Sequence, residues 1–106
     1  MDTYNWDYSE YSDILHIHKK DKPTKGSVEL GDFTLDFGAH DEVVGIEIDH
    51  ASEFFNNVDI DKASLGKIQN AQLIIDNKNP QCRLIFLRLK LSNGIKSIPL
   101  PLPIVA

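Results

Sequence analysis

Two histidines and two carboxylates in the first half of the sequence have side chains of the kind that bind divalent metal ions. His16 and His18 are two residues apart in the run 14–19, so they share one face of an expected strand. Asp32 and Glu47 are expected to meet on the outward side of a neighbouring hairpin. Imidazole and carboxylate ligands together suit a divalent metal. The simpler interpretation is a hydrated polar face with lysine neighbours, because metal ligands need a tight geometry that a sequence does not display.

The hairpin that would position the two carboxylates is predicted from alternating apolar residues. Phe, Leu and Phe occupy every second position over residues 33–37, and the same period recurs over residues 44–48. A four-residue turn at 38–41 places both apolar sets toward one core and puts Asp32 opposite Glu47. Like charges at such a position destabilise a sheet unless a cation or a base lies beside them. The other pairs expected in this register are Phe33 with Ile46, Leu35 with Val44, and Phe37 with Glu42.

Two short helices are expected between the strands of the N-terminal half and those of the C-terminal half. Asp49 or Ser52 can cap the first, which runs through Phe55, and Asp59 or Asp61 the second, which runs through residue 68. A side-chain oxygen at such a position accepts a hydrogen bond from a backbone N–H that the helix leaves unpaired.

The C-terminal half contains the strongest strand pattern, over residues 85–91, where leucine and isoleucine alternate with larger or charged residues. A strand beginning at residues 73–75 and a turn at 77–80 are expected before it. Asn93-Gly94 after it is typical of a two-residue hairpin turn, so residues 95–102 should form the return strand.

The prolines of this return strand conflict with the simplest pairing. A turn made by Asn93-Gly94 places Leu89 opposite Ile98, and it puts Pro99 and Pro101 where the ladder needs N–H donors. Either the loop has four residues, 92–95, or the chain leaves its neighbour after Ser97. In both cases residues 98–103 form an exposed edge that meets another subunit or a partner protein. The predicted interface consists of Ile98, Pro99, Leu100, Pro101 and Leu102.

Composition and charge restrict the class of protein. The 106 residues are 42% hydrophobic and 25% charged, as expected for one globular domain over residues 1–106. The first 61 residues carry 15 acidic and four basic side chains, whereas the remaining 45 carry one acidic and seven basic side chains. The halves should therefore attract each other, within one fold or between subunits. The basic residues are dispersed, so nucleic-acid binding is not expected.

No apolar stretch is long enough to span a bilayer and the N-terminus does not look like a secretory signal, so a cytoplasmic protein without membrane contact is expected. One cysteine and four histidines match no structural zinc spacing, and no cofactor is expected. The fold class that follows is α+β: mainly antiparallel hairpins, with one or two short helices between a β-rich half at 4–54 and a basic hairpin half at 62–103.

Several motifs resemble a known family. They are Trp6-Asp7, the run SDILHI at 12–17, and SVELGDFTLDFGAHDEVVGIEIDHAS at 27–52, of which VVGIEI is the most distinctive part. These are similar to a family of small prokaryotic domains named domain of unknown function 2283, over about residues 4–54. The resemblance implies a compact β-rich fold and supplies no catalytic residues. Some members look like partners of small toxin-type proteins. The turn at 38–42 departs from the family's usual Asp-Gly loop.

The function expected from these observations is a protein-binding or oligomeric assembly module, self-associating or bound to a partner protein. The alternative is a metal-binding or small-molecule-binding protein that uses His16, His18, Asp32 and Glu47. An enzyme ranks third, because the sequence contains no nucleophile elbow and no glycine-rich phosphate loop.

Overall fold

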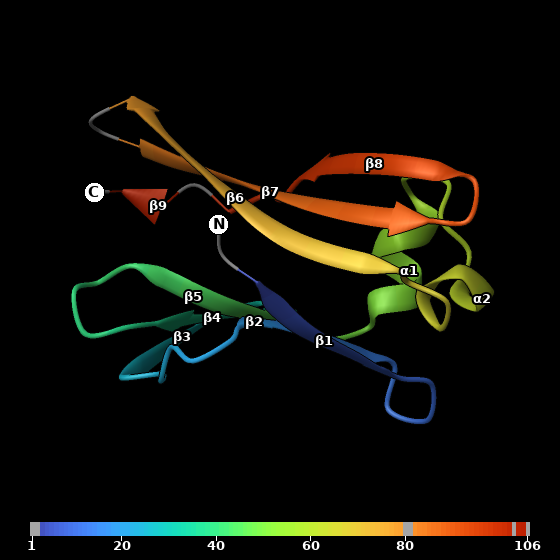
Figure 1. The fold of residues 1–106 in the computed structure, drawn as a ribbon, viewed down its shortest axis with the longest axis horizontal. Coiled ribbons are helices and arrows are strands. Elements are labelled where there is room, and N and C mark those ends of the chain that lie inside the picture. Colours follow the sequence, from blue (N-terminus) through green and yellow to red (C-terminus); the bar gives the residue numbers. More distant parts are fainter. Residues whose placement is uncertain (1–2, 80–81, 103, 106) are drawn as a thin grey trace.

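The chain forms two antiparallel sheets stacked as two layers, with two short helices at one end (Figure 1). The computed structural model describes residues 3–79, 82–102 and 104–105. The N-terminal sheet has the strand order β1-β2-β5-β4-β3. Its strands are β1 (Tyr4–Ser9), β2 (Ile14–Lys19), β3 (Gly26–Leu30), β4 (Phe33–Phe37) and β5 (Val43–Ile48). The predicted strand at 14–19 is confirmed.

The C-terminal sheet has the order β6-β7-β8, and a fourth short strand, β9, also pairs with β7. Its strands are β6 (Asn70–Asn79), β7 (Cys82–Leu91), β8 (Gly94–Pro99) and β9 (Ile104–Val105). The turn expected at 77–80 begins later than predicted, because β6 continues to Asn79, and residues 80–81 lie outside the described part of the chain. The α+β, mainly antiparallel fold class is confirmed.

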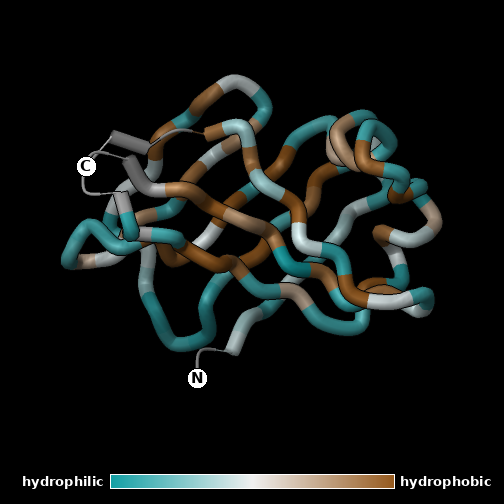
Figure 2. Tube along the Cα trace, turned by 90° about the horizontal axis from the view of Figure 1, so that it is seen from above, coloured by the Kyte–Doolittle hydropathy of each residue, from teal (hydrophilic) through white to brown (hydrophobic). Residues whose placement is uncertain are grey.

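The two layers share one hydrophobic core. Its buried members include Ile17 and Ile46 from one sheet and Leu87 from the other, together with Phe55 and Leu65 from the two helices. Figure 2 shows hydrophobic segments along the strands and hydrophilic ones in the peripheral loops. No helix among the described residues is long and apolar enough to cross a membrane.

The helices α1 (Ala51–Asn56) and α2 (Lys62–Leu65) occupy the expected positions but differ in their caps. Asp61 caps α2 and accepts a hydrogen bond from the Ser64 N–H, as one of the two alternatives predicted. The N-cap of α1 is His50, in a left-handed conformation with no side-chain cap bond, so the prediction of Asp49 or Ser52 was wrong. Helix α1 ends at Asn56, one residue after the predicted limit, whereas α2 ends at Leu65, three residues before it.

The β4–β5 hairpin keeps the predicted faces but has a different register. Phe33 lies opposite Ile48 and Leu35 opposite Ile46, two residues from the predicted pairs. A bulge at Asp36/Phe37 and a loop over 38–42, closed by the Gly38 N–H bonding to the Glu42 carbonyl, account for the change. Beyond the bulge a two-residue slip leaves the side chains on their original faces, because the side-chain period of a strand is two. At the bulge, Val43 joins the core cluster, a position that the alternation assigned to Val44.

The β7–β8 hairpin is also displaced by two residues. Ser92 and Asn93 form the turn between Leu91 and Gly94, so Leu87 lies opposite Ile98. The Leu100 N–H bonds to the Ile85 carbonyl, 2.9 Å away. Alternation along the ladder therefore puts Pro99 at a position that needs no donor toward β7, which removes the conflict predicted from the prolines.

Candidate functional site

The structure does not assemble the four residues predicted as a metal site. His16 lies opposite Glu47, whereas His18 lies one row along, opposite Gly45. Asp32 lies beyond the end of the β4–β5 ladder, where its carbonyl accepts the Asp49 N–H. Thr34, and not Asp32, faces Glu47. The predicted ligand set is therefore wrong in its membership, because the hairpin register on which it depended differs by two residues.

His16 and His18 instead belong to a hydrogen-bonded polar face. The His16 Nε2 lies 3.5 Å from the Asp36 Oδ2, and the two histidine rings make an edge contact at 5.9 Å between centroids. The ring nitrogens of His18 lie 2.7 Å from the Lys19 carbonyl and 2.8 Å from the Thr24 hydroxyl. This outward face thus agrees with the simpler interpretation, a hydrated polar surface with internal bonds.

A different cluster lies at the end of the same sheet. Among the described residues, Asp32, Asp49 and His50 are the group whose possible ligand atoms lie within 4.8 Å of one another. The hydrogen bond of the His50 Nδ1 to Asp32, at 3.2 Å, raises the pKa of that imidazole, and the Asp49 charge adds to the shift. All three side chains are exposed. The same acid–imidazole contacts form on solvated surfaces without an ion, so we assign no metal here.

Asp13 joins the β1–β2 turn to helix α1. Its carboxylate accepts hydrogen bonds from the Tyr8 hydroxyl at 2.5 Å and from the Ser52 hydroxyl and backbone N–H at 2.6 and 3.0 Å. Burial opposes ionisation of this carboxyl, but the bonds from Ser52 and Tyr8 outweigh it and lower its pKa. Burial and the bond to Asp13 raise the pKa of Tyr8 to about 12. These contacts tie two elements together and leave no open site.

The predicted interface in the C-terminal segment is buried in its own chain. The side chains of Ile98, Leu100 and Leu102 are part of the core that the two sheets enclose. β9 continues the return of the chain along β7, with Ile104 opposite Arg83. The prediction that these three apolar residues meet a partner was wrong, because they already pack within the fold. Pro99 and Pro101 are exposed. Of the edge predicted at 98–103, residues 98 and 99 lie in the edge strand β8, residues 100–102 lie in no strand, and residue 103 is outside the described part of the chain.

The face of the C-terminal sheet that points away from the core carries a combination that the sequence analysis missed. We call this surface the β6–β8 outer face. It exposes apolar side chains, among them Ile74, Leu84 and Ile95, next to two cations, Arg88 and Lys90. Its members are Asn70, Gln72, Ile74 and Asp76 on β6, Leu84, Phe86, Arg88 and Lys90 on β7, and Ile95, Ser97 and Pro99 on β8.

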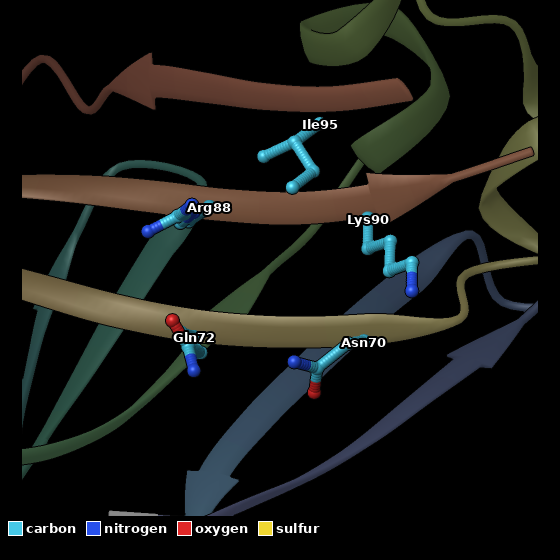
Figure 3. Close-up of a pocket in the computed structure, with 5 residues that line it drawn as sticks. All are labelled: Asn70, Gln72, Arg88, Lys90 and Ile95. Carbon is cyan, nitrogen blue, oxygen red and sulfur yellow. The ribbon is translucent and has the colours of Figure 1, made fainter. Parts of the chain in front are cut away.

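One hollow lies on the β6–β8 outer face, and a second extends from this face around the end of β6. The basic one, of about 230 Å³, is lined by Asn70, Gln72, Arg88, Lys90 and Ile95, which Figure 3 shows spread over three neighbouring strands. The apolar one is an open groove of about 540 Å³ lined by Ile74, Ile75, Asp76, Lys78 and Phe86. A sheet face with exposed apolar side chains beside ordered charges is a surface suited to another protein. The alternation of Phe86, Arg88 and Lys90 with buried leucines was the sequence signal for it.

Part of the N-terminal half is similar to a known protein family. Residues 5–52 match the model of the family described as Protein of unknown function (DUF2283). This match covers β1 to β5 and the start of α1. The resemblance predicted from the motifs of this half is therefore confirmed, and the family's description names no activity. No solved structure matches the chain significantly.

A curated relative from Methanocaldococcus jannaschii is described as uncharacterized protein MJ0789. It is 39% identical over 61 residues, which are 58% of this chain and 50% of that protein. The chain thus spans half the length of the curated relative it matches. The family match ends at residue 52, so the β6–β8 outer face has to be interpreted from its own chemistry.

Proposed function

We propose that this protein is a self-assembling protein-binding module, and that two copies pack through their β6–β8 outer faces. A cytoplasmic setting, as expected from the sequence, is part of the proposal. The observation that carries it is the order of side chains on this face, which is complementary to itself. The proposed module has no catalytic role and binds no metal through His16, His18, Asp32 and Glu47, because their ligand atoms do not converge.

The order of side chains along the strands runs from basic through apolar to acidic. Arg88 lies in one row with Gln72 and Ser97, and the next row holds Ile74, Phe86 and Pro99. The row after that holds Leu84 and Asp76. The apolar row therefore lies between a cation on one side and a carboxylate on the other.

A two-fold axis that lies across the strands at the apolar row inverts this order in the second copy. Arg88 on β7 then lies over Leu84 of the second copy and diagonally beside Asp76 on the adjacent strand of that copy, and the same pair forms again by symmetry. An axis parallel to the strands would instead bring Arg88 onto Arg88, which like charges disfavour. Sheets that pack face to face are about 10 Å apart, a gap that arginine and aspartate side chains can bridge. The charges therefore select one arrangement.

The chemistry of the two partners fits this contact. The Asp76 Oδ1 accepts the Lys78 N–H at 2.9 Å, and a carboxylate has further lone pairs to accept an arginine. Ile74 and Leu84 are exposed by 38% and 46% in the single chain, so packing them against a second copy removes apolar surface from water. Arg88 and Asp76 are not cross-strand neighbours within one chain, because Arg88 lies opposite Gln72 and Asp76 opposite Leu84.

Charge exchange tests the arrangement. Mass measured by light scattering after size exclusion should be twice the 12.0 kDa of one chain for the unaltered protein. Arg88→Glu should give a monomer, because two glutamates then face two aspartates. Asp76→Lys should do the same, and the double variant should restore the dimer. Lys67→Glu, a reversal of an exposed charge outside this face, is the matched control and should stay dimeric.

Two results would overturn the proposal. A monomer for the unaltered protein at every concentration would exclude self-assembly. A double variant that stays monomeric, while both single variants unfold at the wild-type temperature, would exclude the pairing of Arg88 with Asp76.

A further inference from the structure

Strand β3 is an edge that the fold leaves open. Among the strands that the structure describes, it pairs with β4 alone. All five of its residues are exposed, and Val28 and Leu30, on its core-facing side, keep 47% and 40% of their surface in water. The smaller C-terminal sheet thus does not cover the inner side of this strand.

The backbone groups that point away from β4 can be assigned from the hairpin. Leu30 and Phe33 close a two-residue turn and are therefore a hydrogen-bonded pair. The alternation of the ladder then leaves Ser27 and Glu29 with N–H and C=O groups directed outward. The bond from the Asp49 N–H to the Asp32 carbonyl agrees, because it shows that the even-numbered residues of β4 pair with β5.

The two edges of the C-terminal sheet are each blocked at one position by contrast. The outward carbonyl of Leu73 on β6 accepts the hydroxyl of Tyr4, 3.0 Å away. On β8 the outward positions are Ile95, Ser97 and Pro99, and the last of these has no N–H to offer. β3 contains no proline and no lysine, so it lacks the usual protection against an added strand.

We propose that β3 receives an extended segment of a partner protein as an additional antiparallel strand, and that this segment alternates apolar with basic residues. The apolar residues would cover Val28 and Leu30, and the basic ones would lie beside Glu29 on the outer side. Such strand addition combines main-chain hydrogen bonds with pockets for alternate side chains. This surface is separate from the β6–β8 outer face and does not depend on self-assembly.

The charge of the outer side selects this partner over a second copy. Glu29 lies at the end of a row in which its neighbours across the sheet are Thr34, Glu47, His16 and Asp7. Joining two copies through β3 would bring two such acidic rows into one continuous sheet. A basic segment meets opposite charge instead, and opposite charges across strands stabilise a pair.

The test uses the full chain and a labelled peptide of alternating valine and lysine, with binding measured by fluorescence anisotropy. Ser27→Pro removes an outward donor without removing a bond to β4, and it should weaken binding about tenfold. Ser27→Ala is the matched control, because it removes only the hydroxyl that donates to Asp36. It should bind as the unaltered protein does. Glu29→Lys should weaken binding about threefold.

A second measurement keeps the test decisive if the proline variant does not fold. On addition of the peptide to the unaltered protein, hydrogen exchange of the Ser27 and Glu29 amides should slow. Unchanged exchange at these two amides would overturn the proposal. Binding of an alternating valine–glutamate peptide with the same affinity would also overturn it. A third contrary result would be a dimer of this protein that Ser27→Pro dissociates and Arg88→Glu does not, because β3 would then pair with a second copy.

Discussion

At the scale of single residues, several aspartates of this chain adopt a left-handed backbone conformation. Asp13, Asp21, Asp41 and Asp59 all have positive φ, near +60°, where aspartate and asparagine are tolerated better than most residues. Asp13 differs from the others in that its carboxylate also holds Tyr8 and Ser52. It therefore fixes both the turn after β1 and the start of α1.

Asp13→Asn should destabilise the protein by about 1–2 kcal/mol, because the amide nitrogen cannot accept the bonds that the carboxylate accepts. Asparagine tolerates the same backbone conformation, so the change isolates the hydrogen bonds. Asp21→Asn, at φ +61°, is the matched control and should change stability by less than about 0.5 kcal/mol. Urea unfolding of both variants measures the difference, and equal stability would contradict the assigned role.

The same variant should change the dependence of stability on pH. The folded protein lowers the pKa of Asp13 below its ordinary value of 3.8, so the stabilisation is fully present above that value. It is lost as the pH falls through the folded-state pKa, because the unfolded chain binds the proton first. Asp13→Asn should therefore remove part of the acid sensitivity of unfolding.

At the scale of elements, close approach of strands depends on one glycine in β5. A Cβ at Gly45 would lie 2.6 Å from the His18 Cδ2 and 3.0 Å from both the Asp36 Oδ2 and the Ile17 carbonyl. The backbone oxygen cannot move without disturbing the β2–β5 ladder. Gly45 thus allows His18 and Asp36 to converge over the middle of the sheet.

Gly45→Ala should destabilise the fold by about 1–3 kcal/mol through this overpacking. Gly26→Ala is the matched control in β3, where an added Cβ meets nothing within 4 Å and φ is not positive. It should be close to neutral. Thermal unfolding compares the two, and a Gly45→Ala protein as stable as Gly26→Ala would show that the sheet relaxes around the methyl group.

At the scale of the whole molecule, the two layers are joined by packing and by a hydrogen bond from Tyr4. Tyr4 is buried on β1, and its hydroxyl bonds to the Leu73 carbonyl at the edge of β6. The family match covers residues 5–52, so Tyr4 directly precedes it, and this bond connects the sheet that contains the match with the sheet that lies outside it. It also occupies a backbone acceptor that an added strand would otherwise use.

Tyr4→Phe should cost about 1–2 kcal/mol, because it leaves the buried Leu73 acceptor without its donor while keeping the ring. Tyr11→Phe is the control, since Tyr11 is fully exposed. Chemical unfolding of both variants gives the comparison. If the two substitutions have the same effect, the bond between the layers contributes nothing to stability.

The sequence by itself determined which face of each strand is buried. Alternation over 14–19, 33–37, 44–48 and 85–91 is enough for that, because the side-chain period of a strand is two and survives a slip of two residues. The sequence also predicted Asp61 as a possible helix cap, because a carboxylate at that position can accept a hydrogen bond from a backbone N–H of the first turn.

Only the tertiary structure decided which residues lie opposite one another. Register depends on loop length and on the bulge at Asp36/Phe37, which the apolar pattern does not record. For this reason Asp32 could not be placed beside Asp49 and His50 from the pattern. The way in which two unequal sheets stack likewise decided which apolar residues are buried. Leu100 and Leu102 are covered, whereas Ile74 and Val28 stay exposed. A four-stranded layer covers part of a five-stranded one, and which strands it leaves uncovered is a property of the assembled fold.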